Sequence, residues 1–128
     1  MAKESVIVDL EDADQEPFPK PGLLHPKLTQ RLECTELRVN AITPEPGQAT
    51  APHSHERQEA VYVALNGGYV QIGESITDVA PGGVVRIAPD PLRSIRNEGP
   101  DTPQTWLLFG SPPVGIIEDF GEYTMPDE

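Results

Sequence analysis

Short runs of apolar residues, separated by glycine- and proline-rich turns, make up most of this chain. Residues 31–42 are rich in strand-forming residues that partly alternate with polar ones, and this run stops at the turn of residues 43–47. Further short apolar runs occupy residues 60–65, 69–72, 76–80, 84–88, 92–97, 105–109 and 114–117. The pattern predicts about eight short strands, paired antiparallel because the connections are too short for crossover helices.

Two glycine-rich segments mark turns between these runs. Asn66-Gly67-Gly68 predicts a hairpin that joins residues 60–65 to residues 69–72, because Asn and Gly tolerate positive φ angles. Pro81-Gly82-Gly83 predicts another turn. The chain holds 15 prolines and 11 glycines in 128 residues, which disfavours long helices. The sequence therefore predicts an all-β sandwich or barrel in a single domain.

The two ends of the chain differ in composition from its centre. Residues 1–29 carry acidic residues and a proline-rich stretch, which predict an extended, weakly ordered arm that could drape over the core. Residues 118–128 form an acidic tail, so the predicted barrel spans residues 30–117. Of the formal net charge of −12, residues 1–20 and 118–128 together carry −9. The predicted barrel is therefore nearly neutral and leaves room for an anionic ligand.

Composition also limits the partners and the location that we expect. The excess of acidic residues repels polyanions, so nucleic acid is not an expected partner. The single cysteine, Cys34, cannot form an intramolecular disulfide, and we expect it to pack as a small hydrophobic residue. No run approaches the roughly 18 apolar residues that span a bilayer, and the amino terminus lacks the layout of a signal peptide. We therefore expect a cytoplasmic protein without membrane contact.

Metal-ligand chemistry is concentrated in one stretch of the sequence. His53, His55 and Glu59 lie at alternate positions, so on a strand their side chains would share one face. Val61 and Val63 have the same parity and would lie beside them in the interior. Two imidazoles and one carboxylate form the ligand set of non-heme Fe(II), and Zn, Mn or Ni could also use it. The sequence therefore predicts a divalent metal site at these three residues.

The spacing of these residues resembles a known superfamily. Gly47, His53, His55, Glu59 and Asn66-Gly67 resemble the first cupin motif, with the glycine displaced by one place. Residues 81–89 and Asn97 resemble the second motif, so the resemblance covers about residues 35–111. It implies a double-stranded β-helix, that is, a jelly-roll barrel. It also implies a homodimer, which composition does not independently support.

The chain departs from the cupin pattern at Arg93. Metal-binding cupins usually supply a histidine there, four residues before the asparagine, whereas arginine stays protonated and does not ligate metals. Arg93 and Ile95 share parity, so both are predicted to line the same interior as the histidines. In one arrangement a metal binds at His53, His55 and Glu59, and Arg93 clamps an anionic substrate. In the other, Arg93 pairs directly with Glu59 and no metal binds.

Three functions follow from these arrangements. A metal-dependent enzyme could be a dioxygenase with Fe(II), or an isomerase or lyase with Zn or Mn, but no residue identifies the reaction. A non-catalytic protein would hold a small anionic ligand against Arg93 in an apolar cavity lined by Val61, Val63 and Ile95. A third possibility is a protein that serves mainly in assembly, with its arms exchanged between subunits.

Overall fold

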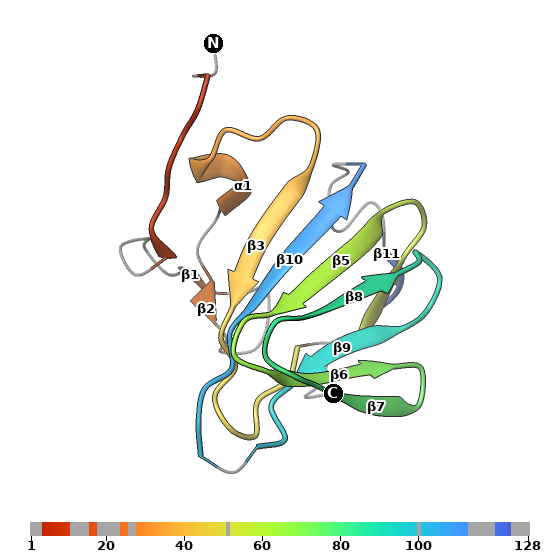
Figure 1. Cartoon of the computed structure of the whole chain (residues 1–128). Helices are drawn as coiled ribbons and strands as arrows, with labels where there is room; N and C mark the ends of the chain where they lie inside the picture. The colour runs from red at the N-terminus through yellow and green to blue at the C-terminus, as the bar shows by residue number, and fades with distance from the viewer. Residues whose placement is uncertain are drawn as a thin grey trace.

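Two antiparallel β-sheets, of four and five strands, form the body of the molecule (Figure 1). The all-β prediction is therefore confirmed, and the arrangement is that of a jelly roll. The only helix of the described residues is α1 (Leu28–Arg31), a single turn beside β3. No helix in this part of the chain is long and apolar enough to cross a bilayer. The computed structural model describes residues 4–10, 16–17, 24–25, 28–50, 52–99, 101–112 and 120–123.

The four-stranded sheet has the order β3-β10-β5-β8, and every neighbouring pair is antiparallel. Its strands are β3 (Arg38–Ile42), β10 (Trp106–Ser111), β5 (Glu59–Ala64) and β8 (Gly83–Ile87). The alternation of residues in these strands is typical of a sheet with one face on the core.

The five-stranded sheet has the order β11-β4-β9-β6-β7, again with antiparallel neighbours. Its strands are β11 (Phe120–Tyr123), β4 (His53–His55), β9 (Arg93–Arg96), β6 (Gly68–Ile72) and β7 (Ser75–Val79). The sequence analysis did not predict β4 as a separate strand, and β11 falls within the predicted acidic tail. The strand predicted at residues 114–117 lies outside the described residues.

The core lies between the inner faces of the two sheets. Its largest member is Trp106, which is fully buried on β10 and packs edge-on to Tyr62, with ring centroids 6.4 Å apart. Gly68 on β6 lies directly against the Trp106 indole, where any side chain would collide. The buried members of this cluster are Ile42, Ala60, Tyr62, Ala64, Val70, Ile87, Ile95 and Trp106.

A second apolar cluster lies on the outer face of the four-stranded sheet. Thr29 of α1 exchanges two hydrogen bonds of 2.8 Å with the backbone of Val39, which fixes the helix to β3. Cys34 packs into this cluster, as expected for a small hydrophobic residue. Residues of the predicted arm thus cover part of the sheet. The other members of the cluster are Val8, Leu10, Leu28, Leu32, Val39, Ala41, Leu107 and Phe109.

Two further short strands lie in the predicted arm. They are β1 (Glu16–Pro17) and β2 (Leu24–His25), and they pair with each other antiparallel. β2 also lies close to β3, at the edge of the four-stranded sheet (Figure 1). The described part of the arm is therefore packed near the body of the molecule.

The predicted hairpin at residues 66–68 is wrong. A turn does occur there, with Gly67 at a φ of 89°, but β5 and β6 on either side of it enter different sheets. The Asn66 side chain explains the difference, because it bonds the segment before β10: its amide donates to the Pro103 carbonyl and its oxygen accepts from the Thr105 N–H. The turn therefore carries the chain from one sheet to the other.

Candidate functional site

The two faces of β5 have different surroundings. Ala60, Tyr62 and Ala64 point into the core between the sheets. Because successive side chains of a strand point to opposite faces, Val61 and Val63 lie on the outer face. The prediction that these two valines line the interior is therefore wrong. Ile95 does lie in the core, as predicted.

Glu59 also lies on the outer face of β5. Its carboxylate accepts a hydrogen bond from Arg86 Nε on β8 at 2.5 Å, and the two side chains are 52% and 63% exposed. The sequence argument assumed one continuous strand from His53 to Glu59. Residues 56–58 instead form a bend between β4 and β5, which belong to different sheets. The alternation of side chains along β4 therefore does not continue into β5. The prediction that Glu59 shares a face with the histidines is corrected accordingly.

His53, His55 and Arg93 share the inner face of the five-stranded sheet. His53 on β4 lies directly opposite Arg93 on β9 in the antiparallel register. Ile95, two residues after Arg93, points into the core, so Arg93 and His53 do the same. The His53 and His55 rings lie edge-to-face, with centroids 5.0 Å apart, and His55 is buried. The structure thus brings together three of the predicted site residues and leaves Glu59 out.

The Arg93 side chain is 1% exposed and is held by the loop between β8 and β9. Its Nε donates to the Pro91 carbonyl at 2.9 Å. Its Nη2 donates to the Pro89 carbonyl at 3.0 Å and also to the Ala88 carbonyl. The third nitrogen, Nη1, is buried without a hydrogen-bond partner among the described residues. Buried polar groups are nearly always paired. Gln104 Oε1 and Trp106 Nε1 are also buried without a partner, but Nη1 is the one of these three atoms that belongs to a charged group.

Tyr62 is the member of this region that the sequence analysis did not assign. It lies buried on the inner face of β5. Burial raises the pKa of its hydroxyl, while the charge of nearby Arg93 acts in the opposite direction. Counting the alternation from Ala60, after the polar bend, would have placed Tyr62 inside.

No carboxylate balances the Arg93 charge in the described part of the chain. Each of the 12 Asp and Glu residues whose side chains are described there is exposed. The predicted alternative, in which Arg93 pairs with Glu59, is therefore also wrong, because Glu59 pairs with Arg86 on the opposite face. Taking a guanidinium out of water without an anionic partner costs several kcal/mol even after relaxation. A cation without a counter-ion in the described interior is the main electrostatic feature of the site.

The inner-face residues do not fit a divalent metal. Among the described residues, no three His, Cys, Asp or Glu side chains lie close enough together to hold one. Arg93 lies opposite His53, and a guanidinium offers only donors and a fixed positive charge. Two imidazoles beside that cation form an incomplete and repulsive ligand set. We therefore derive no chemistry through a metal ion.

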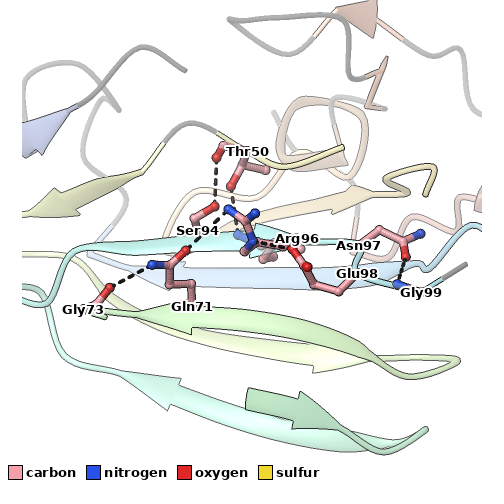
Figure 2. Close-up of polar contacts among 9 residues, drawn as sticks. Thr50, Gln71, Gly73, Ser94, Arg96, Asn97, Glu98 and Gly99 are labelled. Atoms are coloured by element: carbon pink, nitrogen blue, oxygen red, sulfur yellow. Dashed lines mark hydrogen bonds and ion pairs between the residues drawn. The ribbon is translucent and has the colours of Figure 1, made fainter. Parts of the chain in front are cut away.

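The outer face of β9 shows how arginine is accommodated where acids are available. Arg96 donates through Nε to Glu98 at 2.7 Å and through Nη1 to Gln71 at 3.4 Å (Figure 2). Ser94, also on this face, donates to the Thr50 carbonyl at 2.9 Å. These side chains have partners in the fold and are not assigned to the site.

Comparisons with solved structures give the fold. No protein-family model and no curated protein matches the sequence. A sugar phosphate isomerase of the cupin superfamily from Silicibacter pomeroyi matches with a TM-score of 0.74 and 18% identity, over 95% of this chain and 94% of the other. A protein of Thermus thermophilus matches with a TM-score of 0.67 and 26% identity, over 83% and 96%. A cupin protein from Bacteroides fragilis matches with a TM-score of 0.63 and 24% identity, over 90% and 95%. This chain therefore has the fold of the cupin proteins among these structures.

Proposed function

We propose that this small cupin binds a small anionic molecule at Arg93, on the inner face of the five-stranded sheet. One observation carries the proposal: Arg93 is a buried cation with an unpartnered Nη1 and without a carboxylate partner in the described part of the chain. A bound anion would supply both the counter-charge and the missing hydrogen-bond acceptor. Charge-assisted hydrogen bonds of this kind are about twice as strong as neutral ones.

His53 and His55 fit this role as neighbours of the anion. Imidazoles can donate hydrogen bonds to it or exchange protons with it near neutral pH. His53 is the more exposed of the two, which supports entry of the ligand from its side of the sheet. Ile95, on the strand that carries Arg93, supplies an apolar wall. Two donor rings beside a fixed cation suit an isomerase that acts on an acidic substrate.

The comparisons are compatible with this proposal but do not define the ligand. One structural neighbour is described as a sugar phosphate isomerase, whose substrate is anionic. At 18% identity, that similarity supports the fold and not the substrate. The proposal therefore depends on the Arg93 environment.

The test is a binding screen with matched arginine variants. Acetate, pyruvate, inorganic phosphate and glucose 6-phosphate would be titrated calorimetrically into the wild-type protein, Arg93→Lys and Arg96→Lys. We expect at least one anion to bind, its affinity to fall at least tenfold in Arg93→Lys, and Arg96→Lys to leave it unchanged. Lysine keeps the charge, so this variant has the better prospect of folding. Equal binding by both variants, or no binding by any of the four anions, would contradict the proposal.

Two expectations from the sequence stay predictions. We propose, from the resemblance to cupins, that the protein is a homodimer, which sedimentation equilibrium would test. We also propose that it acts in the cytoplasm, consistent with its single cysteine.

A further inference from the structure

We propose that the anion is bound through a single oxygen atom, shared by Arg93 Nη1 and the Tyr62 hydroxyl, so that the site prefers small carboxylates to phosphate esters. This inference rests on the proposed function and specifies its ligand. It is drawn from the number of donors that Arg93 has left, from the position of Tyr62 and from the charge of the inner face.

The backbone already uses most of the Arg93 donors. The Nε atom has one hydrogen and donates to Pro91. The Nη2 atom has two hydrogens and meets two carbonyl oxygens, those of Ala88 and Pro89. The two-pronged recognition of phosphate or carboxylate needs N–H groups on two different nitrogens. Only Nη1 still has hydrogens to donate, so Arg93 can bind an anion through one nitrogen only.

The loop that holds Arg93 keeps it in this orientation. Pro89 and Pro91 have φ angles fixed by their rings, and the Pro89 carbonyl also accepts a 2.8 Å hydrogen bond from the backbone N–H of His55. Rotation of the guanidinium to present two nitrogens would break its bonds to this loop. The Ala88 and Pro91 carbonyls would then lose the Arg93 donor, and the Pro89 carbonyl would keep only its bond from His55.

Tyr62 supplies the second donor from the opposite sheet. It lies on the inner face of β5, facing the sheet that carries Arg93, and its hydroxyl is close enough to Arg93 to experience the charge of the guanidinium. The protonated hydroxyl has one hydrogen that it can donate to a ligand. Burial raises its pKa, so the hydroxyl remains protonated, and hence a donor, at neutral pH. The packing of its ring on Trp106 limits its movement.

The charge of the inner face favours a monoanion. Arg93 is the only Arg or Lys among the described residues that is buried, and the described acids are all exposed. A carboxylate carries one negative charge, which Arg93 balances. A phosphate monoester carries about −1.5 to −2 at pH 7, so part of its charge would stay uncompensated in the interior. The same site would therefore bind the carboxylate more tightly.

The experiment compares two ligand classes and two tyrosine variants. Pyruvate and glucose 6-phosphate would be titrated into the wild-type protein, Tyr62→Phe and Tyr69→Phe, with Arg93→Lys as the reference for loss of the site. Binding would be followed by calorimetry and by the fluorescence of the single tryptophan, Trp106, which contacts Tyr62. We expect pyruvate to bind at least tenfold more tightly than glucose 6-phosphate, and Tyr62→Phe to weaken pyruvate binding at least tenfold. Tyr69 lies on the outer face of β6, so Tyr69→Phe should bind as wild type.

The outcomes separate this inference from the proposed function. If glucose 6-phosphate binds as tightly as pyruvate or more so, and Arg93→Lys weakens it, the single-oxygen inference is wrong and the anion site stands. If Tyr62→Phe binds pyruvate as wild type does, the shared oxygen is also wrong. If Arg93→Lys changes the binding of neither anion, both proposals fail. If neither anion binds to the wild-type protein, this inference fails, and the proposed function fails with it when acetate and inorganic phosphate do not bind either. Circular dichroism on each variant establishes that it is folded before binding is compared.

Discussion

Arg93 and Arg96 lie on the same short strand, yet they have opposite surroundings. Arg96 lies on the outer face, with its side chain 34% exposed, and it pairs with Glu98 and Gln71 (Figure 2). Arg93 lies on the inner face, where backbone carbonyls take two of its nitrogens and the third has no partner among the described residues. The outer arginine has an acidic partner in its own fold, whereas the inner one has none among the described residues. The two arginines are three residues apart on one strand, so their side chains point to opposite faces of the sheet. This difference in direction, and not the residue type, makes Arg93 a candidate site.

The largest expected effect is on stability when Arg93 is truncated. Arg93→Ala would remove the donors of three loop carbonyls and leave a cavity, so we expect the free energy of unfolding to fall by about 3–5 kcal/mol. Arg96→Ala breaks only a partly exposed pair and should cost about 1 kcal/mol or less. Urea unfolding of both variants measures the difference. Similar losses in the two would contradict the contrast between the faces.

A gain of metal binding would sharpen the same comparison. Arg93→His would place a third imidazole opposite His53 and remove the fixed cation, which together make a usable zinc ligand set. We expect the affinity for Zn²⁺ to rise at least a hundredfold over the wild-type protein, measured by competition with a chromogenic chelator. Arg96→His, on the outer face, is the control and should show no gain. If the two variants bind Zn²⁺ equally, Arg93 does not lie beside the histidines.

The pH dependence of stability tests the burial of Tyr62. The pKa of its hydroxyl is raised in the folded protein, so above about pH 10 the unfolded chain loses this proton while the folded chain retains it. The stability that depends on the protonated hydroxyl is therefore full below pH 10 and is lost as the pH rises above it. We expect a decline of up to about 1.4 kcal/mol per pH unit from this group. Urea unfolding between pH 9 and 11 measures this dependence. The free energy of unfolding should fall less steeply with pH in Tyr62→Phe than in the wild-type protein, and Tyr69→Phe should show the wild-type slope.

The smallest effect is expected at Glu59. Its pair with Arg86 is exposed on both sides, so Glu59→Gln should lower the free energy of unfolding by about 1 kcal/mol or less. The same variant should leave anion binding at Arg93 unchanged, because the carboxylate lies on the outer face. Unfolding and pyruvate titrations on one sample measure both quantities. A tenfold change in the affinity for pyruvate would indicate that Glu59 lies near the anion on the inner face, which would contradict the structure.

Local patterns predicted the parts of the fold that depend on neighbouring residues. The apolar runs at residues 60–65 and 84–88 predicted strands that the structure has as β5 and β8, and the jelly roll followed from the cupin-like spacing. Arg93 was recognised because it replaces a ligand that this motif usually supplies. Its inward direction was also predictable, since Ile95 has the same parity on the same strand.

Predictions from residue alternation and turn signals were wrong at two places where the chain passes from one sheet to the other. At residues 56–58 the alternation restarts, so Glu59 lies on the outer face, against the prediction, and Tyr62 lies on the inner face. At Asn66 a local hairpin signal was overridden by side-chain bonds to Pro103 and to Thr105. A residue count along the chain cannot detect such a change of sheet, because long-range hydrogen bonds determine it.

The sequence was sufficient to predict the class of fold and the separation of acidic ends from a nearly neutral centre. These properties follow from composition and short-range patterns, whereas the significance of the arginine at position 93 followed from the resemblance to the cupin motifs. Which side chains meet inside depended on the packing of the two sheets, which separated Glu59 from the histidines and brought Tyr62 close to Arg93. Strand parity is local, whereas the pairing of strands and the burial of a charge are properties of the whole fold.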